Sequence, residues 1–374
     1  MTLFKQALSY DDVLLAPQYS DIESRSEVSL VSELDKQNRF ELPIIGSPMD
    51  TVVEGEMAVA LSQLGALGIV HRYNSILDQK RMVWEVANTV CNKPVAAAIA
   101  ITGDFMERAE ALIDAGVDIL CVDVAHGHHI MMKDALSTLK RNLPPNIHIM
   151  AGNVATRKGY EALAEWGADS VRIGIGGGSI CSTRVQTGHG IPTFQSVLDC
   201  SESECAGDIP IIADGGVKTS GDIVKALGAG ADFVMIGSLF SGTTETPGKI
   251  LQAADGAKMK EYRGMASREA QLAWRGRASS LEGIATFVPL KGKVKYVLDD
   301  LVSGIRSGLS YTGCRSIPEF QMNAKFIHQT TAGQLESSTH IWDGNDKIKG
   351  RARQKNCLHG NHKAAGRLSY SLGL

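Results

Sequence analysis

The sequence contains no closely paired cysteines and no long apolar run. Its seven cysteines among 374 residues are scattered without C-x-x-C pairs. This pattern disfavours a zinc site or a disulfide framework and predicts reduced thiols. The opening MTLFKQALSYDD lacks the basic and apolar regions of a signal peptide, and no stretch reaches the roughly 18 apolar residues of a membrane span. We therefore expect a cytoplasmic protein with no membrane partner.

Excess charge of one sign is also missing. The formal net charge is -3 and the pI is about 6.4. A polyanionic partner normally requires a basic face, so we expect no nucleic-acid partner, while small anions remain possible ligands. With 44% hydrophobic and 21% charged residues, the chain can bury a large core. One barrel of about 250 residues with extensions fits this length.

A repeating pattern runs from about Pro94 to Ser238. Helix-like segments alternate with short apolar runs. Most of these apolar runs directly follow an Asp that has a Gly one or two positions before it. We interpret the apolar runs as buried strands: PVAAAIA at Pro94, Ala115 to Ala125, HIMAGNV at His148, Trp166 to Gly176, IPIIADGG at Ile209, and Gly230 to Ser238. Buried strands alternating with helices form a parallel sheet, and a (β/α)8 barrel is the architecture that we predict.

Polar and small residues follow the predicted strands. Asp123, Asn153, Cys181, Asp214 and Gly237 all come at or after a strand's carboxyl end. Taken singly, several of these are equally consistent with turn chemistry. In a (β/α)8 barrel, however, they would share one rim, and that rim is where such barrels bind substrates.

One glycine-rich loop carries a possible nucleophile. The segment Gly174 to Thr183, GIGGGSICST, places Cys181 among small residues. Glycines let backbone N–H groups approach an anion closely, and the thiol beside them can attack an electrophile. The spacing G-x-G-x-G-S differs from the dinucleotide fingerprint G-x-G-x-x-G. A nucleophile beside a phosphate cradle therefore indicates nucleotide chemistry.

Two later segments depart from the repeat. Residues 261–289 mix Gly, Ser, Arg and aromatic residues, and we expect a flap or lid loop over the rim. Residues 342–374 are polar, basic and poor in large apolar side chains. We expect a disordered tail there. The predicted domain organisation is one catalytic barrel over residues 1–341, flap included, followed by the tail at 342–374.

Ordered motifs along the chain resemble those of the IMP dehydrogenase and GMP reductase superfamily, from about Leu8 to His340. The matching landmarks are SYDDVLLAP at Ser9, GSPMDTV at Gly46, GALGIVHR at Gly65, DVAHGH at Asp123, MAGNV at Met150, GIGGGSICSTR at Gly174, ADGG at Ala213, MIGS at Met235 and YRGM at Tyr262. This resemblance implies a homotetramer of barrels that act on purine nucleoside monophosphates.

The resemblance also implies catalytic roles. Cys181 would attack C2 of the purine and form a covalent thioimidate, which divides one difficult displacement into two easier steps. Thr183 would lie near the group that leaves or enters at C2. Glu282 would contact the N1 edge and move protons.

The ligand contacts are likewise implied by the resemblance. The phosphate would bind Ser179, Gly216, Gly237, Ser238 and Tyr262, and Asp214 would accept bonds from the ribose hydroxyls. Ser47, Met49, Gly264 and Met265 would complete the purine pocket. Asp123 and Ala125 would lie on the nicotinamide side. The carbonyls of Gly176, Gly178 and Cys181 match positions that hold a monovalent cation, usually potassium.

The motifs leave the choice of reaction open. Nothing corresponding to the paired CBS modules of many dehydrogenases is inserted around Val86 to Ile99, and Trp274 to Arg277 reads WRGR where dehydrogenases carry an Arg-Tyr pair. Both features favour a GMP reductase that uses NADPH. AHGHH after Val124 and LEGIATFVPLKG from Leu281 depart from the reductase pattern, so an IMP dehydrogenase without CBS modules, using NAD, is the alternative. Arg275 or Arg277 could then supply the base.

A third interpretation is a non-catalytic nucleotide-binding homologue. It predicts binding without turnover and little effect of Cys181→Ser on affinity. The joint presence of Cys181, Thr183 and Glu282 argues against it.

Overall fold

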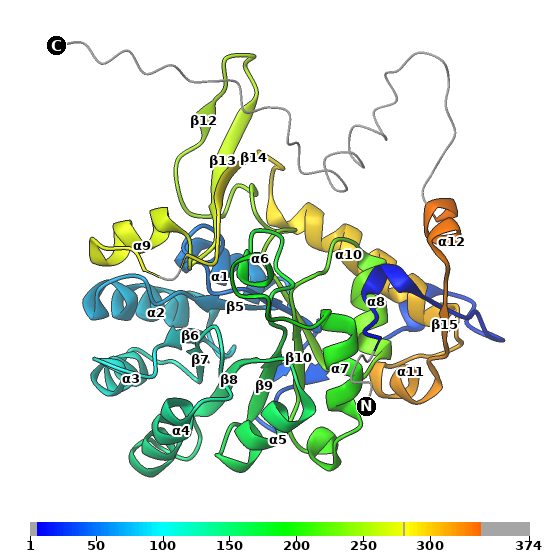
Figure 1. Ribbon diagram of the computed structural model, residues 1–374, viewed down its shortest axis with the longest axis horizontal. Helices are drawn as coiled ribbons and strands as arrows, with labels where there is room; N and C mark the ends of the chain where they lie inside the picture. Colours follow the sequence, from blue (N-terminus) through cyan, green and yellow to red (C-terminus); the bar gives the residue numbers. More distant parts are fainter. Residues whose placement is uncertain (1–5, 280, 338–374) are drawn as a thin grey trace. The chain divides into compact units, whose positions relative to one another are not determined.

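A closed barrel of eight parallel strands forms the centre of the protein, as Figure 1 shows. The structure is a computed structural model that describes residues 6–279 and 281–337. In barrel order the strands are β4 (Ile44–Gly46), β5 (Leu67–Val70), β6 (Ala96–Ile99), β7 (Ile119–Asp123), β8 (His148–Val154), β9 (Ser170–Ile173), β10 (Ile211–Asp214) and β11 (Phe233–Ile236). The predicted (β/α)8 fold is confirmed. All six strands that the repeat predicted are present.

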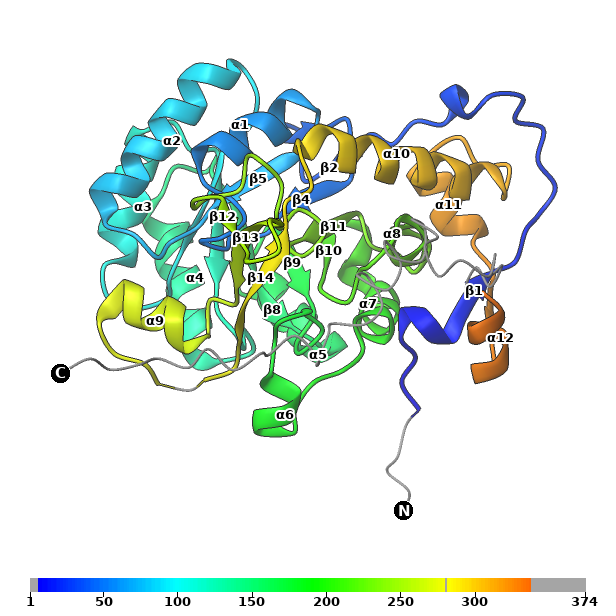
Figure 2. The ribbon, with the colours of Figure 1, turned by 90° about the horizontal axis from the view of Figure 1, so that it is seen from above.

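Helices pack around the barrel (Figure 1, Figure 2). The surrounding set is α1 (Gly55–Gln63), α2 (Ile76–Val90), α3 (Phe105–Asp114), α4 (Ile130–Asn142), α5 (Arg157–Glu165), α7 (Thr193–Ser201), α8 (Ser220–Gly228) and α10 (Val294–Ser310). In α2, Ser75 caps the first turn by accepting a bond from Asp78 N at 3.0 Å. Its buried residues Gln79, Val83, Val86 and Val90 recur every three or four positions, so one stripe faces the barrel.

Apolar side chains fill the barrel interior. Those from the strands are Ile45, Leu67, Ile69, Ala96, Ala98, Ile119, Cys121, Met150, Ile212, Phe233 and Met235. The hairpin of β2 (Ser32–Glu33) and β3 (Arg39–Phe40) adds Leu34 and Phe40, and Phe40 meets Phe233 edge to face at 5.7 Å. This packing fills the amino-terminal end of the barrel within the described residues, which leaves the opposite rim for a ligand site.

The segment expected to be a flap loop is instead largely regular structure. β12 (Leu251–Gln252), β13 (Lys258–Arg263) and β14 (Ala285–Pro289) form an antiparallel sheet, and α9 (Arg268–Arg275) lies between β13 and β14 in the chain. Figure 1 shows this sheet standing out from the barrel. The buried ammonium of Lys260 anchors β13 by donating to the carbonyls of Thr243, Thr244 and Thr246. Cross-strand pairing of β13 with β14 gives the predicted flap a regular framework on both sides of α9.

The remaining elements join the chain ends to the barrel or link its strands. They are η1 (Tyr10–Asp12), β1 (Val13–Leu15), η2 (Arg25–Glu27), α6 (Thr183–Thr187), η3 (Glu204–Gly207), α11 (Ile317–Asn323), β15 (Phe326–His328) and α12 (Thr331–Glu336). β1 pairs with β15 in antiparallel fashion. One compact unit extends to His328 and a second begins at Gln329. The predicted tail at 342–374 lies outside the described residues.

Two further observations concern the described part of the chain. None of its helices is both long and apolar enough to cross a membrane. Six cysteines fall within it, and all six are free thiols. Cys357 lies outside the described residues.

Candidate active site

A hydrogen-bonded relay runs from the exposed thiol of Cys181 to a carboxylate. Cys181 Sγ donates to Thr183 Oγ1 at 3.1 Å, and Thr183 Oγ1 donates to Glu282 Oε2 at 2.7 Å. The contact between Thr183 and Glu282 cannot be deduced from local sequence, because the two residues are 99 positions apart. A thiol proton can therefore move through one hydroxyl to a carboxylate, which leaves the sulfur nucleophilic.

Backbone pairing brings the relay together. Ser182 N donates to Glu282 O at 2.9 Å, and Ile284 N donates to Ile180 O at 3.1 Å. Cys181 and Gly283 consequently form an isolated antiparallel bridge. The two loop segments run side by side, so backbone hydrogen bonds hold the thiol and the carboxylate together.

Glycine is required where the catalytic loop leaves β9. Gly174 has φ +149°, and a Cβ atom there would lie 1.9 Å from Asp214 O. No other residue fits without moving β10 or the loop. The close approach fixes the start of the loop against the strand that carries Asp214.

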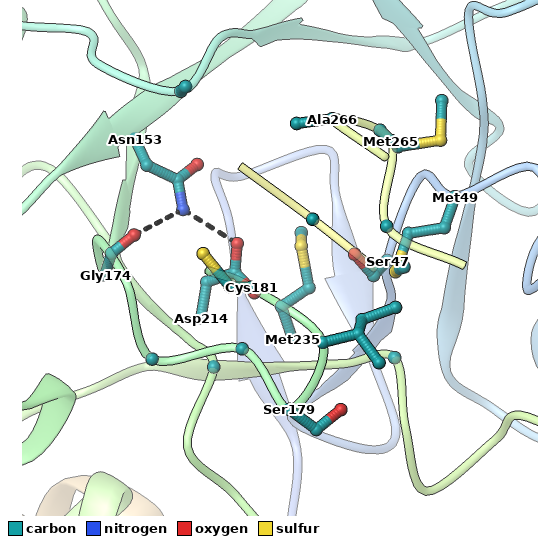
Figure 3. A pocket seen from close by; sticks show the side chains of 18 of the residues that line it. Ser47, Met49, Asn153, Gly174, Ser179, Cys181, Asp214, Met235, Met265 and Ala266 are labelled. Carbon is teal, nitrogen blue, oxygen red and sulfur yellow. Dashed lines mark hydrogen bonds between the residues drawn. The ribbon is translucent and has the colours of Figure 1, made fainter. Parts of the chain in front are cut away.

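One pocket of about 370 Å³ at the rim contains every site residue predicted from the sequence. Figure 3 shows Ser47, Met49, Ser179, Cys181, Asp214 and Met265 around it. Its predicted members are Ser47, Met49, Asp123, Ala125, Gly176, Gly178, Ser179, Cys181, Thr183, Asp214, Gly216, Gly237, Ser238, Tyr262, Gly264, Met265 and Glu282. The volume suits a small organic ligand. The structure thus brings together all of the candidate residues.

A buried arginine links two carboxylates in the pocket wall. Arg172 donates to Asp123 Oδ1 at 2.7 Å and to Asp214 Oδ2 at 2.9 Å. Asn153 Nδ2 also donates to Asp214 Oδ2, at 2.8 Å (Figure 3). Burial raises the pKa of Asp123, but the charges of Arg172 and Arg72 outweigh it, so the pKa lies below its ordinary value. Asp123 is therefore held as a carboxylate.

A second side of the pocket offers neutral donors. Ser179 Oγ and Tyr262 Oη are 3.2 Å apart. Gly216 has φ +81°, and a Cβ on Gly237 would lie 3.1 Å from Met49 Sδ. Burial raises the pKa of Tyr262 to about 12, with a smaller opposing effect from Ser179. The phenol remains protonated near neutral pH and can donate to an anion alongside backbone N–H groups.

The sequence prediction missed several residues of the pocket. Arg72, Tyr73, Arg172 and Lys218 all line it. Only Arg172 left a signal, because it is a charged residue inside the otherwise apolar run of β9. Lys218 forms an ion pair with Asp11 at 2.7 Å. Arg72 ends the landmark GALGIVHR, whereas nothing in the local sequence distinguishes Tyr73 or Lys218 from surface residues.

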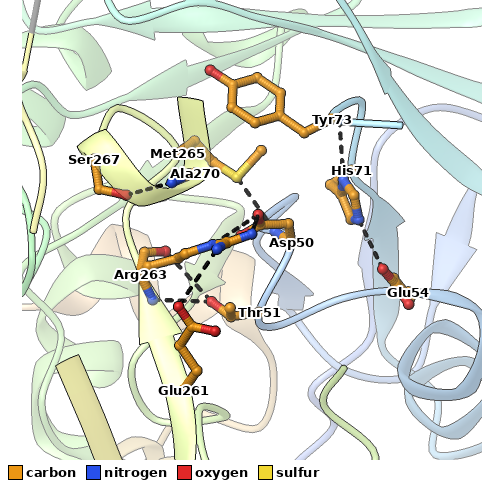
Figure 4. Close-up of polar contacts among 10 residues, drawn as sticks. All are labelled: Asp50, Thr51, Glu54, His71, Tyr73, Glu261, Arg263, Met265, Ser267 and Ala270. Atoms are coloured by element: carbon orange, nitrogen blue, oxygen red, sulfur yellow. Dashed lines mark hydrogen bonds and ion pairs between the residues drawn. The ribbon is translucent and has the colours of Figure 1, made fainter. Parts of the chain in front are cut away.

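An ion pair joins the loop after β4 to β13. Arg263 Nε and Nη2 donate to Asp50 Oδ2 at 3.0 and 2.6 Å, and Asp50 N donates to Met265 Sδ at 3.3 Å. Arg263 N also donates to Thr51 Oγ1 at 3.1 Å (Figure 4). The loop that carries Ser47 and Met49 is therefore tied to the strand and turn that carry Tyr262 and Met265.

Several buried polar atoms around the pocket have no partner among the described residues. They include Arg72 Nε, Asn153 Oδ1 and Arg172 Nε. Arg72 Nε lies 3.6 Å from Asp123 Oδ2, which is longer than a hydrogen bond. Buried donors and acceptors normally find partners, so these three atoms are unsatisfied polar groups of the pocket wall.

Fold and site together define a (β/α)8-barrel enzyme with a nucleophilic thiol at its carboxyl-terminal rim. The family model for the IMP dehydrogenase / GMP reductase domain matches residues 7–340. The chain belongs to this family, whose members are oxidoreductases of purine nucleotides that use NAD or NADP.

Both inosine-5′-monophosphate dehydrogenases and GMP reductases are similar to the chain. The inosine-5′-monophosphate dehydrogenase of Nitrosopumilus maritimus (strain SCM1) is 33% identical, over 90% of this chain and 98% of the relative. That of Borreliella burgdorferi is 36% identical, over 90% and 97%. The GMP reductase of Leishmania major is 32% identical, also over 90% and 97%. Overall identity therefore does not separate the two reactions.

A solved structure is similar throughout the chain. The crystal structure of a GMP reductase from Trypanosoma brucei in complex with guanosine 5′-monophosphate has a TM-score of 0.85 and 32% identity, and the match covers 91% of this chain and 99% of that one. The shared fold includes the barrel and rim on which the pocket is built.

Proposed function

We propose that the protein is a GMP reductase, which converts GMP and NADPH to IMP, ammonia and NADP. The main support for this proposal is the set of residues that line the pocket. It contains the relay of Cys181, Thr183 and Glu282, whereas neither Arg275 nor Arg277 lines it. Arg275 is held by Gln271 Oε1 at 2.6 Å and by Ser279 Oγ at 2.9 Å. An arginine held in this way is not placed to act as the base that activates a water molecule beside Cys181.

The relay accounts for the first half of the reaction. The thiol proton passes through Thr183 to Glu282, and the sulfur of Cys181 bonds to C2 of GMP. Glu282 then returns a proton through Thr183 to the exocyclic amine, which leaves as ammonia while the thioimidate forms. NADPH, when bound, supplies the hydride that reduces C2 before the carbon–sulfur bond breaks. Asp214 orients the ribose, and Ser179, Gly216, Gly237, Ser238 and Tyr262 bind the phosphate.

The cofactor and cation belong to the same proposal. Asp123 and Ala125 line the pocket and would face the nicotinamide. A monovalent cation, most naturally potassium, would be held by the carbonyls of Gly176, Gly178 and Cys181. Neutral carbonyls on one tight turn suit such an ion better than a divalent metal. The homotetramer stays a prediction, which light scattering of the purified protein can check.

The second candidate is an IMP dehydrogenase that oxidises IMP to XMP with NAD. The observation in its favour is the set of relatives, since the dehydrogenases of Nitrosopumilus maritimus and Borreliella burgdorferi match along almost their whole length. Both candidates use the same thiol and the same nucleotide site.

Paired turnover assays separate the candidates. The purified protein is incubated with GMP and NADPH, and separately with IMP and NAD, while absorbance at the reduced-nicotinamide band is followed. We expect turnover in the first mixture, with IMP as product, and none in the Cys181→Ala variant. Turnover in the second mixture alone would replace the proposal with the dehydrogenase. Nucleotide binding without turnover in either mixture would indicate a non-catalytic homologue.

A further inference from the structure

An aromatic stack joins the flap helix to the barrel rim. The rings of Tyr73 and Trp274 lie 5.6 Å apart, with 12° between their planes. The Arg72 guanidinium lies 5.2 Å from the Tyr73 ring, and the Arg108 guanidinium lies 5.9 Å from the Trp274 ring. Tyr73 lines the pocket and Trp274 does not. The indole of Trp274 therefore backs the ring that forms this part of the pocket wall.

The barrel side of the stack is rigidly held. Arg108 is 3% exposed and donates to Gln79 Oε1 at 2.7 Å and to Asp104 Oδ2 at 2.9 Å. Tyr73 N donates to His71 Nδ1 at 3.1 Å, and His71 Nε2 lies 3.1 Å from Glu54 (Figure 4). Buried, satisfied networks of this kind fix the geometry of their members. The stack thus gives α9 a fixed attachment point.

The flap side connects directly to the reacting residues. Ser267 caps α9 by accepting a bond from Ala270 N at 3.2 Å, and Ala270 is fully buried. Met265 precedes the helix, Glu282 follows it, and both line the pocket. The position of α9 therefore determines where Met265 and Glu282 lie in the nucleotide pocket.

We propose that Trp274 determines the fate of the covalent adduct, by fixing α9 so that hydride rather than water reaches C2. The inference rests on the proposed function. Once ammonia has left, C2 is bonded to the sulfur of Cys181 and is electrophilic toward any nucleophile that reaches it. The stack of Trp274 on Tyr73 holds α9 at the rim, and truncating the indole releases this side of the flap and admits water to the adduct. An aromatic side chain covers 150 to 250 Å² on average, so its loss leaves a large opening.

The competing step balances without any added oxidant. The oxygen of water bonds to C2 of the adduct, and its proton passes through Thr183 to Glu282. The carbon–sulfur bond then breaks, and the sulfur recovers a proton. The net reaction is GMP plus water giving XMP plus ammonia. XMP formed from GMP therefore reports water at the adduct.

The test compares three variants for the ratio of XMP to IMP formed from GMP and NADPH, separated by chromatography. In Trp274→Ala we expect the XMP share to rise at least about tenfold over wild type, since that requires only a modest shift between two barriers. Trp274→Phe retains a stacking ring and should restore IMP as the product. Leu272→Ala is the matched control, because Leu272 lies on α9, is 46% exposed and has no contact in the stack.

A second measurement follows α9 without catalysis. Amide hydrogen exchange across 268–275 should speed up in Trp274→Ala and remain unchanged in Leu272→Ala. Unchanged exchange in Trp274→Ala, or slower turnover with IMP still the sole product, would overturn the role of Trp274. Failure of the proposed function has a different signature, namely no IMP from GMP by the wild-type protein. Wild-type XMP formation from IMP and NAD would reject both ideas.

Discussion

At the scale of single residues, the chemistry depends on one hydroxyl between a thiol and a carboxylate. Thr183 accepts from Cys181 and donates to Glu282, so it uses both functions of its oxygen. The hydroxyl belongs to the first residue of α6, and the carboxylate comes from the flap. The relay is therefore sensitive to a change that preserves side-chain shape but removes one oxygen.

Replacement of Thr183 by Val tests the relay. Valine keeps the volume but cannot pass a proton, so we expect kcat to fall by about 10² to 10⁴, the usual contribution of general acid–base catalysis. The KM for GMP should change little, because the phosphate and ribose contacts are intact. Steady-state kinetics measure both constants.

Thr187→Val is the matched control for that substitution. Thr187 lies one turn later on α6, where its hydroxyl donates to Thr183 O at 2.8 Å, and it does not line the pocket. We expect its kcat to stay within a few-fold of wild type. Equal losses in the two variants would mean that the helix, rather than proton transfer, had been damaged.

At the scale of secondary-structure elements, ion pairs hold the rim loops and the barrel floor in register. Arg263→Lys probes the tie between β13 and the loop after β4. Lysine cannot reproduce two donors on Asp50 Oδ2, so Tyr262 and Met265 lose their fixed position. We expect the KM for GMP to rise about tenfold, equivalent to about 1.4 kcal/mol, with kcat within about threefold.

Separate measurement of kcat and of the KM for GMP tests the prediction for Arg263→Lys. A fall in kcat with an unchanged KM would show that the pair acts on the chemical step instead. Arg277→Lys serves as its control, because Arg277 is exposed on the same flap and does not line the pocket. It should leave both constants close to those of the wild type.

The pair of His148 and Asp35 at the amino-terminal end of the barrel predicts that the stability of the protein depends on pH. His148 Nδ1 lies 2.5 Å from Asp35 Oδ2, and His148 Nε2 lies 2.8 Å from Ser170 Oγ. Burial raises the pKa of Asp35, but bonds from His148, Asn38 and two backbone N–H groups lower it further, to well below its ordinary value. The hairpin of β2 and β3 is held to the barrel through this carboxylate.

The sign follows from the lowered pKa. The stabilising contribution of Asp35 is complete above its unfolded pKa of about 3.9 and is lost as the pH falls toward its folded value. Asp35→Asn should reduce the free energy of unfolding by about 1–3 kcal/mol at pH 7, with a shrinking difference from pH 5 to pH 3. Urea denaturation of both proteins across this range measures it. A difference that does not change with pH would contradict the assignment.

At the scale of the whole molecule, the pocket draws on segments from Ser47 to Gly283, and the first compact unit extends to His328. We therefore expect a chain that ends at Ser337 to keep its kcat and KM within about twofold and its Tm within about 2 °C. Thermal unfolding and the GMP assay check this. A loss of activity at unchanged Tm would show that residues beyond Ser337 contribute to the site.

The repeat and the rim motifs made much of this protein predictable from its sequence. Buried parallel strands are continuous apolar runs, so six of eight were visible. β4 and β5 were not predicted individually, because they precede the repeat that begins near Pro94 and each contains a glycine. The strands of the flap were not predicted, because antiparallel pairing of β13 with β14 depends on a partner more than twenty residues away.

The sequence by itself determined the barrel, the family motifs and the residues that gather at the rim, because local periodicity and residue type carry that information. Tertiary structure alone decided which side chains touch. It joined Thr183 to Glu282, placed Arg172 between Asp123 and Asp214, and stacked Trp274 on Tyr73. These contacts span 42 to 201 positions, and only closure of the barrel and the flap brings such distant residues within a few ångströms.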